Sequence, residues 1–177
     1  RKLGDIYDAE KFRSFTKSGD LYCLFFEKGI NLLRKGGTLS FITSNKWMKA
    51  AYGKAIRKYF VENTNPKILI DFSGVKVFDT ATVDVNILLL EKDKNLFDTS
   101  ACTIKEDAFQ NLNYYLCKNF SKTKFVSDSQ WVILPEFEKT IKNKIIKVGK
   151  PLSEWSISIK FGMKTCFNDA FVIDEDT

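Results

Sequence analysis

The chain has 177 residues, of which 44% are hydrophobic and 14% aromatic, and its formal net charge is +6. This composition can form a hydrophobic core and excludes intrinsic disorder, while the length suits one ordinary domain or two incomplete ones. A basic surplus of this size is compatible with nucleic acid, although proteins that bind none can carry it too.

The cysteine and histidine counts limit the chemistry further. The four cysteines, Cys23, Cys102, Cys117 and Cys166, form no CxxC pair, and there is no histidine. No metal site is therefore expected, and catalysis by Ser-His or Cys-His pairs is excluded. Free thiols are typical of a reducing compartment, which predicts a cytoplasmic protein. No apolar run has membrane-spanning length, and the first residues lack a signal-peptide core.

The first half of the chain alternates helices and strands. We expect a helix over 20–34, a strand over 38–43, a helix over 47–62, and strands over 67–72 and 83–91. Asp20 is the expected N-cap of the first helix, Gly36-Gly37 its end, and Ser44 or Asn45 the cap of the second. Continuous apolar runs in the strands predict an α/β sheet that is covered on both faces.

The second predicted helix has two distinct faces. Its aromatic and aliphatic residues share one side, and the charged residues Lys54, Arg57 and Lys58 lie on the other. We expect the basic side to be an ordinary solvated surface. Trp47, just before this helix, is expected in the core or at a domain interface, as is Trp155.

The second half is less regular. Residues 92–130 are polar, with a possible strand near 101–104 and a short helix after Asp107. Residues 130–134 are predicted as a strand or an extended tie, and Pro135 suits the first turn of a helix near 135–148. Two strands around a loop over 162–168 are expected to follow. The chain opens without Met and ends directly after a strand-like run, which indicates a piece of a longer protein.

Common cofactor and metal motifs are missing from the sequence. It contains neither GxGxxG nor GxxxxGK[ST], and Gly36-Gly37 follows a helix, which is the wrong context for a phosphate-binding loop. Asn65-Pro66 is not followed by Pro-Tyr and is predicted as a turn. Asp79 and Asp84 flank a loop and could form a carboxylate pair, but no base or metal motif accompanies them.

Four segments, taken in order, resemble one family of enzymes. They are DLYCLFFEKGINLLRKGGTLSFITSNKWMKAAYGKAIRKYF, ILIDFSGVKVFDTATVDVNILLLEK, PLSEW and ISIKFGMKTCFNDAFVID. This succession resembles the TaqI-like adenine-specific DNA methyltransferases and the related type IIG restriction-modification enzymes. The resemblance covers most of residues 18–94 and 150–174, and the stretch between is only loosely similar.

The resemblance implies a fold and a domain order. Residues 1–95 would be the rear half of a Rossmann-like class I methyltransferase domain, with a mixed α/β sheet whose last strand is antiparallel. Residues 96–150 would be a connecting region with a linker helix near 135–148. Residues 151–177 would be the first β-hairpin of a DNA-recognition domain.

The resemblance also implies an activity for the parent protein. Such enzymes transfer a methyl group from S-adenosylmethionine to the exocyclic amino group of adenine in double-stranded DNA, commonly within restriction-modification systems. They bind the donor with a glycine-containing loop after the first strand and hold the amine with Asn-Pro-Pro-Tyr after the fourth. Neither motif occurs in this sequence. The donor is thus expected to bind mainly to upstream residues, and the fragment alone is expected to be inactive.

Phe78 is the candidate for stacking on the target base. A base inside a duplex must be rotated into a pocket before it can react, and an aromatic ring then replaces the lost stacking, worth about 1–3 kcal/mol per base. Phe78 occupies the place where this family puts that ring, in a loop at a strand end where α/β proteins bind ligands. The alternative is that Phe78 plugs the edge of the sheet.

Six further residues are candidates for DNA binding: Asn45, Lys46, Lys160, Lys164, Thr165 and Asn168. The first two lie between a strand end and a helix start, where they could contact phosphate, or where Asn45 could simply cap the helix. The other four fall in the closing hairpin, where the family's recognition domain begins. Lysine and threonine suit phosphate contacts and asparagine an adenine edge, while an ordinary turn is the alternative.

Two other functions remain open from the sequence. A methyltransferase of the same fold that acts on RNA or protein would need no Asn-Pro-Pro-Tyr upstream and would give Phe78 no role. A non-catalytic, basic nucleic-acid-binding module would bind DNA tightly as this chain alone. The sequence does not indicate an oligomeric state.

Overall fold

The computed structural model describes residues 11–80 and 82–158. The chain divides into two compact units, Arg1–Lys139 and Thr140–Thr177. The first unit contains a five-stranded sheet. Among the described residues we find no helix with the length and hydropathy of a membrane span.

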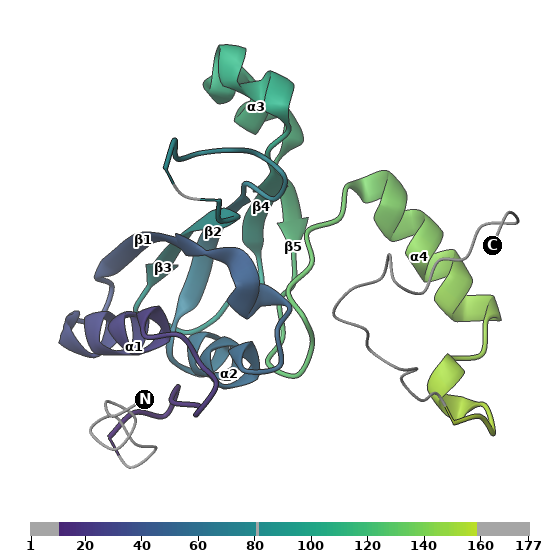
Figure 1. Cartoon of the computed structure of the whole chain (residues 1–177), viewed down its shortest axis with the longest axis horizontal. Helices are drawn as coiled ribbons and strands as arrows, with labels where there is room; N and C mark the ends of the chain where they lie inside the picture. Colours follow the sequence, from purple (N-terminus) through teal and green to yellow (C-terminus); the bar gives the residue numbers. More distant parts are fainter. Residues whose placement is uncertain (1–10, 81, 159–177) are drawn as a thin grey trace, which may run out of the picture. The chain divides into compact units, whose positions relative to one another are not determined.

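The sheet is mixed and has the order β1-β3-β2-β4-β5. Its strands are β1 (Thr38–Ser44), β2 (Asn65–Asp71), β3 (Val85–Glu91), β4 (Thr99–Thr103) and β5 (Ser121–Thr123). β3 lies between β1 and β2 and is antiparallel to both, whereas β2 and β4 are parallel and β5 is antiparallel to β4 (Figure 1). The predicted α/β class is therefore confirmed, and so is the mixed sheet with strand 83–91 antiparallel.

Seven helical segments accompany the sheet in the part of the chain described. They are α1 (Tyr22–Leu32), the 3₁₀ turn η1 (Asn45–Met48), α2 (Gly53–Asn63), η2 (Glu106–Asn111), α3 (Leu112–Asn119), α4 (Glu136–Val148) and η3 (Leu152–Glu154). α1 and α2 pack side by side against one face of the sheet, and α3 lies beyond the end of β4 (Figure 1). The linker helix predicted near 135–148 is observed as α4.

The main core lies between the sheet and helices α1 and α2, and it is rich in aromatic rings. Trp47 packs edge-on against Phe60 and Trp131, with ring centroids 5.3 and 5.2 Å apart. Trp131 stacks on Phe125 at 4.5 Å. The backbone N–H of Trp131 donates to the carbonyl of Met48, so residues 130–134 form the predicted extended tie rather than a strand.

The opposite face of the sheet has a smaller core. Phe72, Val85, Cys102 and Ile104 form it near β4, together with Ala108 of η2. Residues along β1 alternate between exposed and partly buried. In the described part of the chain, the expected cover on both faces is therefore complete only around β2, β3 and β4. The sheet continues past residue 95 through β4 and β5, while the domain boundary proposed at that residue stays a prediction.

The predicted helix 47–62 is wrong as a single element. The chain forms η1, turns, and starts α2 only at Gly53. The reason is a close approach, because a side chain at Gly53 would overlap the carbonyl group of Trp47. Asp20 is not the N-cap of α1 either. The helix begins one residue later, after Leu21, and the carboxylate of Asp20 accepts a hydrogen bond only from the Leu21 N–H.

Arg57 is the main error in the predicted basic face. Its side chain is buried, with 4% of the residue exposed, and Nη1 donates to the carbonyls of Trp47, Met48 and Ala50. Burial lowers the pKa of the guanidinium from its ordinary value. One planar guanidinium thus donates to three carbonyls of the turn after β1. Arg57 is therefore a structural brace for that turn.

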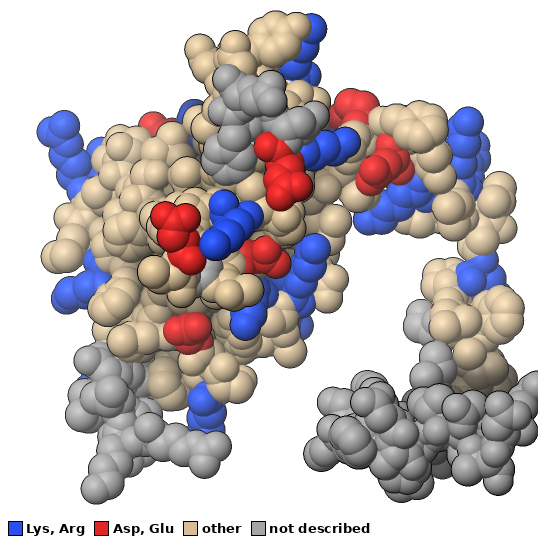
Figure 2. Space-filling view, turned by 45° about the horizontal axis from the view of Figure 1, so that its top comes forward, with Lys and Arg blue, Asp and Glu red and all other residues tan. Residues whose placement is uncertain are grey.

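The surface charges of the compact unit are mixed. Figure 2 shows lysine and arginine side chains interspersed with acidic ones over the face in view, without one large basic field. Several of the described acids pair with lysines or arginines, for example Glu62 with both Arg13 and Lys58. The net charge of +6 is thus not concentrated on this face.

Replacing Arg57 with Met should lower the free energy of unfolding by about 2–4 kcal/mol, because the carbonyls of Trp47, Met48 and Ala50 all lose the hydrogen bond from Arg57. Urea unfolding followed by tryptophan fluorescence measures this. Lys58→Met, on the exposed side of the same helix, is the control and should change the value by about 0.5 kcal/mol or less. Equal losses for the two variants would contradict the bracing role.

Candidate functional site

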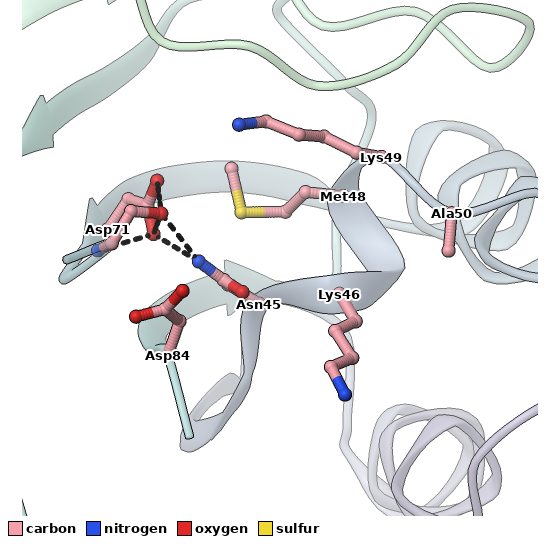
Figure 3. A pocket seen from close by; sticks show the side chains of 8 residues that line it. Asn45, Lys46, Met48, Lys49, Ala50, Asp71 and Asp84 are labelled. Atoms are coloured by element: carbon pink, nitrogen blue, oxygen red, sulfur yellow. Dashed lines mark hydrogen bonds between the residues drawn. The ribbon is translucent and has the colours of Figure 1, made fainter. Parts of the chain in front are cut away.

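A hollow of about 350 Å³ opens at one end of the sheet. β1 and β2 run in the same direction, since each is antiparallel to β3, so their carboxyl ends meet at this edge beside the start of β3. Its lining residues are Asn45, Lys46, Met48, Lys49, Ala50, Asp71, Ser73 and Asp84 (Figure 3). The volume is in the range of small-molecule sites, and strand ends of this kind are where open α/β sheets bind ligands.

One wall of the hollow is the 3₁₀ turn η1, which follows β1 directly. The Ser44 hydroxyl accepts from the Lys46 N–H, and the Asn45 N–H donates to the carbonyl of Asp84 at 3.0 Å. Lys46 and Lys49 extend in different directions from this turn (Figure 3). Both are exposed, and within residues 11–80 and 82–158 neither forms an ion pair. They therefore place two unpaired lysine side chains at the rim, beside the two acids Asp71 and Asp84.

The floor is built around the carboxylate of Asp71, the last residue of β2. Asp71 is 5% exposed. The side-chain amide of Asn45 donates to Asp71 Oδ1 at 2.8 Å and to Ser73 Oγ at 2.7 Å. Ser73 donates to Asp71 from both its N–H, at 3.2 Å, and its hydroxyl, at 2.9 Å. The carboxylate is thus satisfied by neutral donors from two segments.

Strand register extends this polar arrangement across the sheet. Asn86 pairs with Thr43 on one side and with Asp71 on the other, so the three residues form one row. Asn86 is fully buried, and its Oδ1 accepts from Trp47 Nε1 at 3.3 Å and from the Thr43 hydroxyl at 3.2 Å. Trp47 thereby ties η1 to the strand that starts beside the hollow.

The loop over 72–84 starts and ends at the hollow. Residues 72–75 form a turn in which the Val75 N–H donates to the Phe72 carbonyl, and Gly74, with φ of 78°, occupies the position that requires a positive angle in a type II turn. The Gly74 N–H donates to the Asp84 carboxylate at 3.0 Å. Val75 is buried, and Val77 packs on the smaller core.

Phe78 follows this held segment, with 42% of the residue exposed. It is not among the residues that line the hollow. Two of the other predicted residues, Asn45 and Lys46, do line it. Lys160, Lys164, Thr165 and Asn168 lie outside the described residues, as does most of the expected hairpin.

The sequence did not point to Asp71, Ser73 or Lys49. The available signal was an acid that ends the buried run KILID, followed at once by Phe-Ser-Gly. Of the suggested pair, Asp84 lines the hollow and its carboxylate accepts from the Gly74 N–H, whereas Asp79 is not among the lining residues.

The positive-φ glycines of the described residues do not stand between a strand and a helix. Their glycines with positive φ are Gly36 and Gly74. Gly36 lies between α1 and β1, and Gly74 between two strands. In this part of the chain, neither stands where a strand leads into a helix, which is the arrangement that binds dinucleotides and related cofactors.

Comparison with known proteins identifies relatives of the chain. Residues 2–78 match the model of the Eco57I restriction-modification methylase family. The type II restriction enzyme and methyltransferase RM.Eco57I of Escherichia coli is 31% identical over 118 residues, covering 67% of this chain and 10% of that protein. The predicted resemblance to restriction-modification methyltransferases is confirmed. The type II methyltransferase M.BstVI of Geobacillus stearothermophilus is 23% identical over 188 residues, covering 93% of this chain and 33% of that protein.

A solved structure agrees on the fold. A modification subunit assigned to a type I restriction enzyme from Vibrio vulnificus YJ016 superposes with a TM-score of 0.50 at 13% identity, covering 62% of this chain and 29% of that one. The chain spans 10% and 33% of the lengths of the two relatives above.

Gly74→Ala should lower the free energy of unfolding by about 1–2 kcal/mol, because alanine is strained at a positive φ. Gly36→Ala is a matched control, since Gly36 has φ of 74° and, like Gly74, open space around the added methyl group. Urea unfolding should give similar losses for both variants. A neutral or stabilising Gly74→Ala would contradict the type II turn at the start of the loop.

Proposed function

We propose that the protein containing this chain is a DNA methyltransferase of a restriction-modification system. It would transfer a methyl group from S-adenosylmethionine to the exocyclic amino group of an adenine rotated out of double-stranded DNA. The observation that carries the proposal is the polar hollow at the strand ends, next to a loop with an exposed phenylalanine. It occurs in a chain whose relatives are named as restriction-modification methyltransferases.

Phe78 is proposed as the ring that stacks on the flipped base. A phenylalanine that only plugged the sheet would be buried, as Phe72 is at 5% exposure, whereas 42% of Phe78 is exposed. The preceding residues are anchored by Val75 and Val77, so the ring is presented from a defined backbone position. An ordered ring loses little conformational entropy when a base stacks on it.

Lys46 and Lys49 are proposed to contact DNA phosphates at the rim of the hollow, with Asn45 beside them. Neither lysine forms an ion pair within the described residues, so each is available to a phosphate. Lys160, Lys164, Thr165 and Asn168 remain proposed DNA contacts in a recognition domain that begins near residue 151. In this proposal residues 1–95 belong to the methyltransferase domain and residues 96–150 connect the two.

The methyl donor is proposed to bind to residues of the parent protein outside this chain. The sequence has no Asn-Pro-Pro-Tyr, and the described residues have no glycine turn between a strand and a helix. We therefore propose that the 177-residue chain alone transfers no methyl group. Its own contribution would be to hold the base by stacking and to orient DNA through the rim lysines.

Phe78→Ala in the full-length protein should lower kcat/KM for methylation of duplex DNA by roughly 5- to 150-fold, which corresponds to about 1–3 kcal/mol of stacking energy. Tritiated methyl transfer measures the rate, and 2-aminopurine placed at the target adenine reports stacking. Phe25→Ala, at a ring on α1 that is also exposed, is the control. If both variants keep full activity, Phe78 has no part in base binding. Methylation of RNA or protein in preference to DNA would overturn the proposed substrate.

Lys46→Gln and Lys49→Gln should each weaken DNA binding and make it less sensitive to salt. The slope of log K against log salt concentration should become shallower by about 0.9 for each phosphate that the variant no longer neutralises. Fluorescence anisotropy at several salt concentrations measures the slope. Lys122→Gln on β5, where the lysine already pairs with Asp98, is the control and should leave the slope unchanged. Unchanged slopes for the rim variants would exclude phosphate binding there.

A further inference from the structure

The loop that carries Phe78 and the turn that carries Lys46 and Lys49 are joined by hydrogen bonds on two sides. On one side, the Asp71 carboxylate accepts from the Asn45 amide of η1 and from Ser73 at the start of the loop. On the other, the Asp84 carbonyl at the end of the loop accepts from the Asn45 N–H. Hydrogen bonds of Asn45 therefore link the turn to both ends of the loop.

The Asp71 carboxylate holds the turn from a buried position. It is almost completely buried, and within the described residues no cation pairs with it. Three neutral donors, the Asn45 amide, the Ser73 N–H and the Ser73 hydroxyl, satisfy the carboxylate instead of a counterion. Its benefit is geometric, because one carboxylate can accept from several donors at once and so fix the relative placement of two segments.

The backbone beyond Ser73 transmits this placement to Phe78. The turn at Gly74 is closed by the Asp84 carboxylate, Val75 is buried, and Val77 packs on the smaller core. Few residues between Asp71 and Phe78 are thus free to absorb a shift. A substitution of Asp71 should therefore displace the Phe78 ring, because the intervening backbone has little freedom to adjust.

We propose that Asp71 is a positioning residue that sets the placement of Phe78 relative to Lys46 of η1 and to Lys49, which follows that turn. The inference rests on the proposed stacking role of Phe78 and goes beyond it. A single buried carboxylate would then fix the position of the ring relative to the rim lysines. The flipped base, on Phe78, and an adjacent phosphate, on the lysines, would then be bound at a fixed distance from each other.

The test is a double-mutant cycle in the full-length protein with Asp71→Asn, Phe78→Ala and both together. Asp71→Asn keeps the size of the side chain but sets an amide N–H₂ against the donors that the carboxylate accepted. We expect kcat to fall about 10- to 100-fold, as for a misplaced reacting group, with KM nearly unchanged. The stacked component of the 2-aminopurine decay should be lost. In the Phe78→Ala background, Asp71→Asn should change kcat by about twofold or less, because the two residues act as one unit.

Thr99→Val is the control for a general loss of stability. Thr99 is buried, and its hydroxyl donates to the Pro66 carbonyl at the other end of β2, about 17 Å from Asp71 at the usual rise per residue. It should lower the melting temperature and leave kcat and the 2-aminopurine decay unchanged. If Asp71→Asn does not fold, Ser73→Ala, which removes the loop-side hydroxyl donor, takes its place in the cycle.

The outcomes separate this inference from the proposed function. A Phe78→Ala variant with full activity removes the stacking role and the inference with it. Suppose that Phe78→Ala lowers kcat and that Asp71→Asn lowers kcat by the same factor with and without the Phe78 ring. This result overturns only the positioning role. So does a Thr99→Val variant that reproduces the loss of kcat. Non-additive losses in kcat, with the stacked component missing in each single variant, support the proposal.

Discussion

The pairing of β3 between β1 and β2 is the constraint on which the site depends. Because β3 is antiparallel to both neighbours, the carboxyl ends of β1 and β2 and the first residues of β3 meet at one edge of the sheet. Leu88 and Leu90 of β3 are completely buried in the main core, which holds the strand in place. A slip of one residue would send these side chains to the opposite face and break the row that contains Asn86 and Asp71.

The turn after β1 depends in addition on groups that come from elsewhere in the chain. The guanidinium of Arg57 satisfies the carbonyls of Trp47, Met48 and Ala50. The backbone of Trp131, more than eighty positions further on, donates to the same Met48 carbonyl. Buried aromatic rings and one buried cation therefore support the wall of the hollow, although the turn η1 itself is only four residues long.

Much of the architecture follows from local pattern. The apolar runs near 38–43, 67–72 and 83–91 predicted three strands to within two residues, because burial on a sheet selects continuous β-branched and aliphatic residues. β5 was missed because its three residues, Ser-Lys-Thr, have no apolar signal. The second helix was predicted too long, since its break comes from the close approach of Gly53 to the Trp47 carbonyl. That contact lies between backbone groups, so the hydrophobic periodicity of the sequence does not indicate it.

The site was predicted less completely than the fold. Asn45 and Lys46 could be found because polar residues between a strand end and a helix start stand out. Asp71 could not, since an acid at the end of an apolar run is equally typical of a solvated strand end. Arg57 was assigned to a solvated face for the same kind of reason. In both cases the decisive partners are backbone or side-chain groups from other segments, which helical or strand periodicity does not contain.

The residues that line the hollow all come from one continuous stretch, positions 45 to 84. Each hydrogen bond among Asn45, Asp71, Ser73, Gly74 and Asp84 has both partners inside it. If two homologous genes recombine with a crossover outside this stretch, the hybrid protein keeps all the residues of the network from one parent. A crossover within the stretch would combine network residues from two parents. Such a stretch can be inherited as a block, although the turn at its start still depends on the Trp131 backbone from further along the chain.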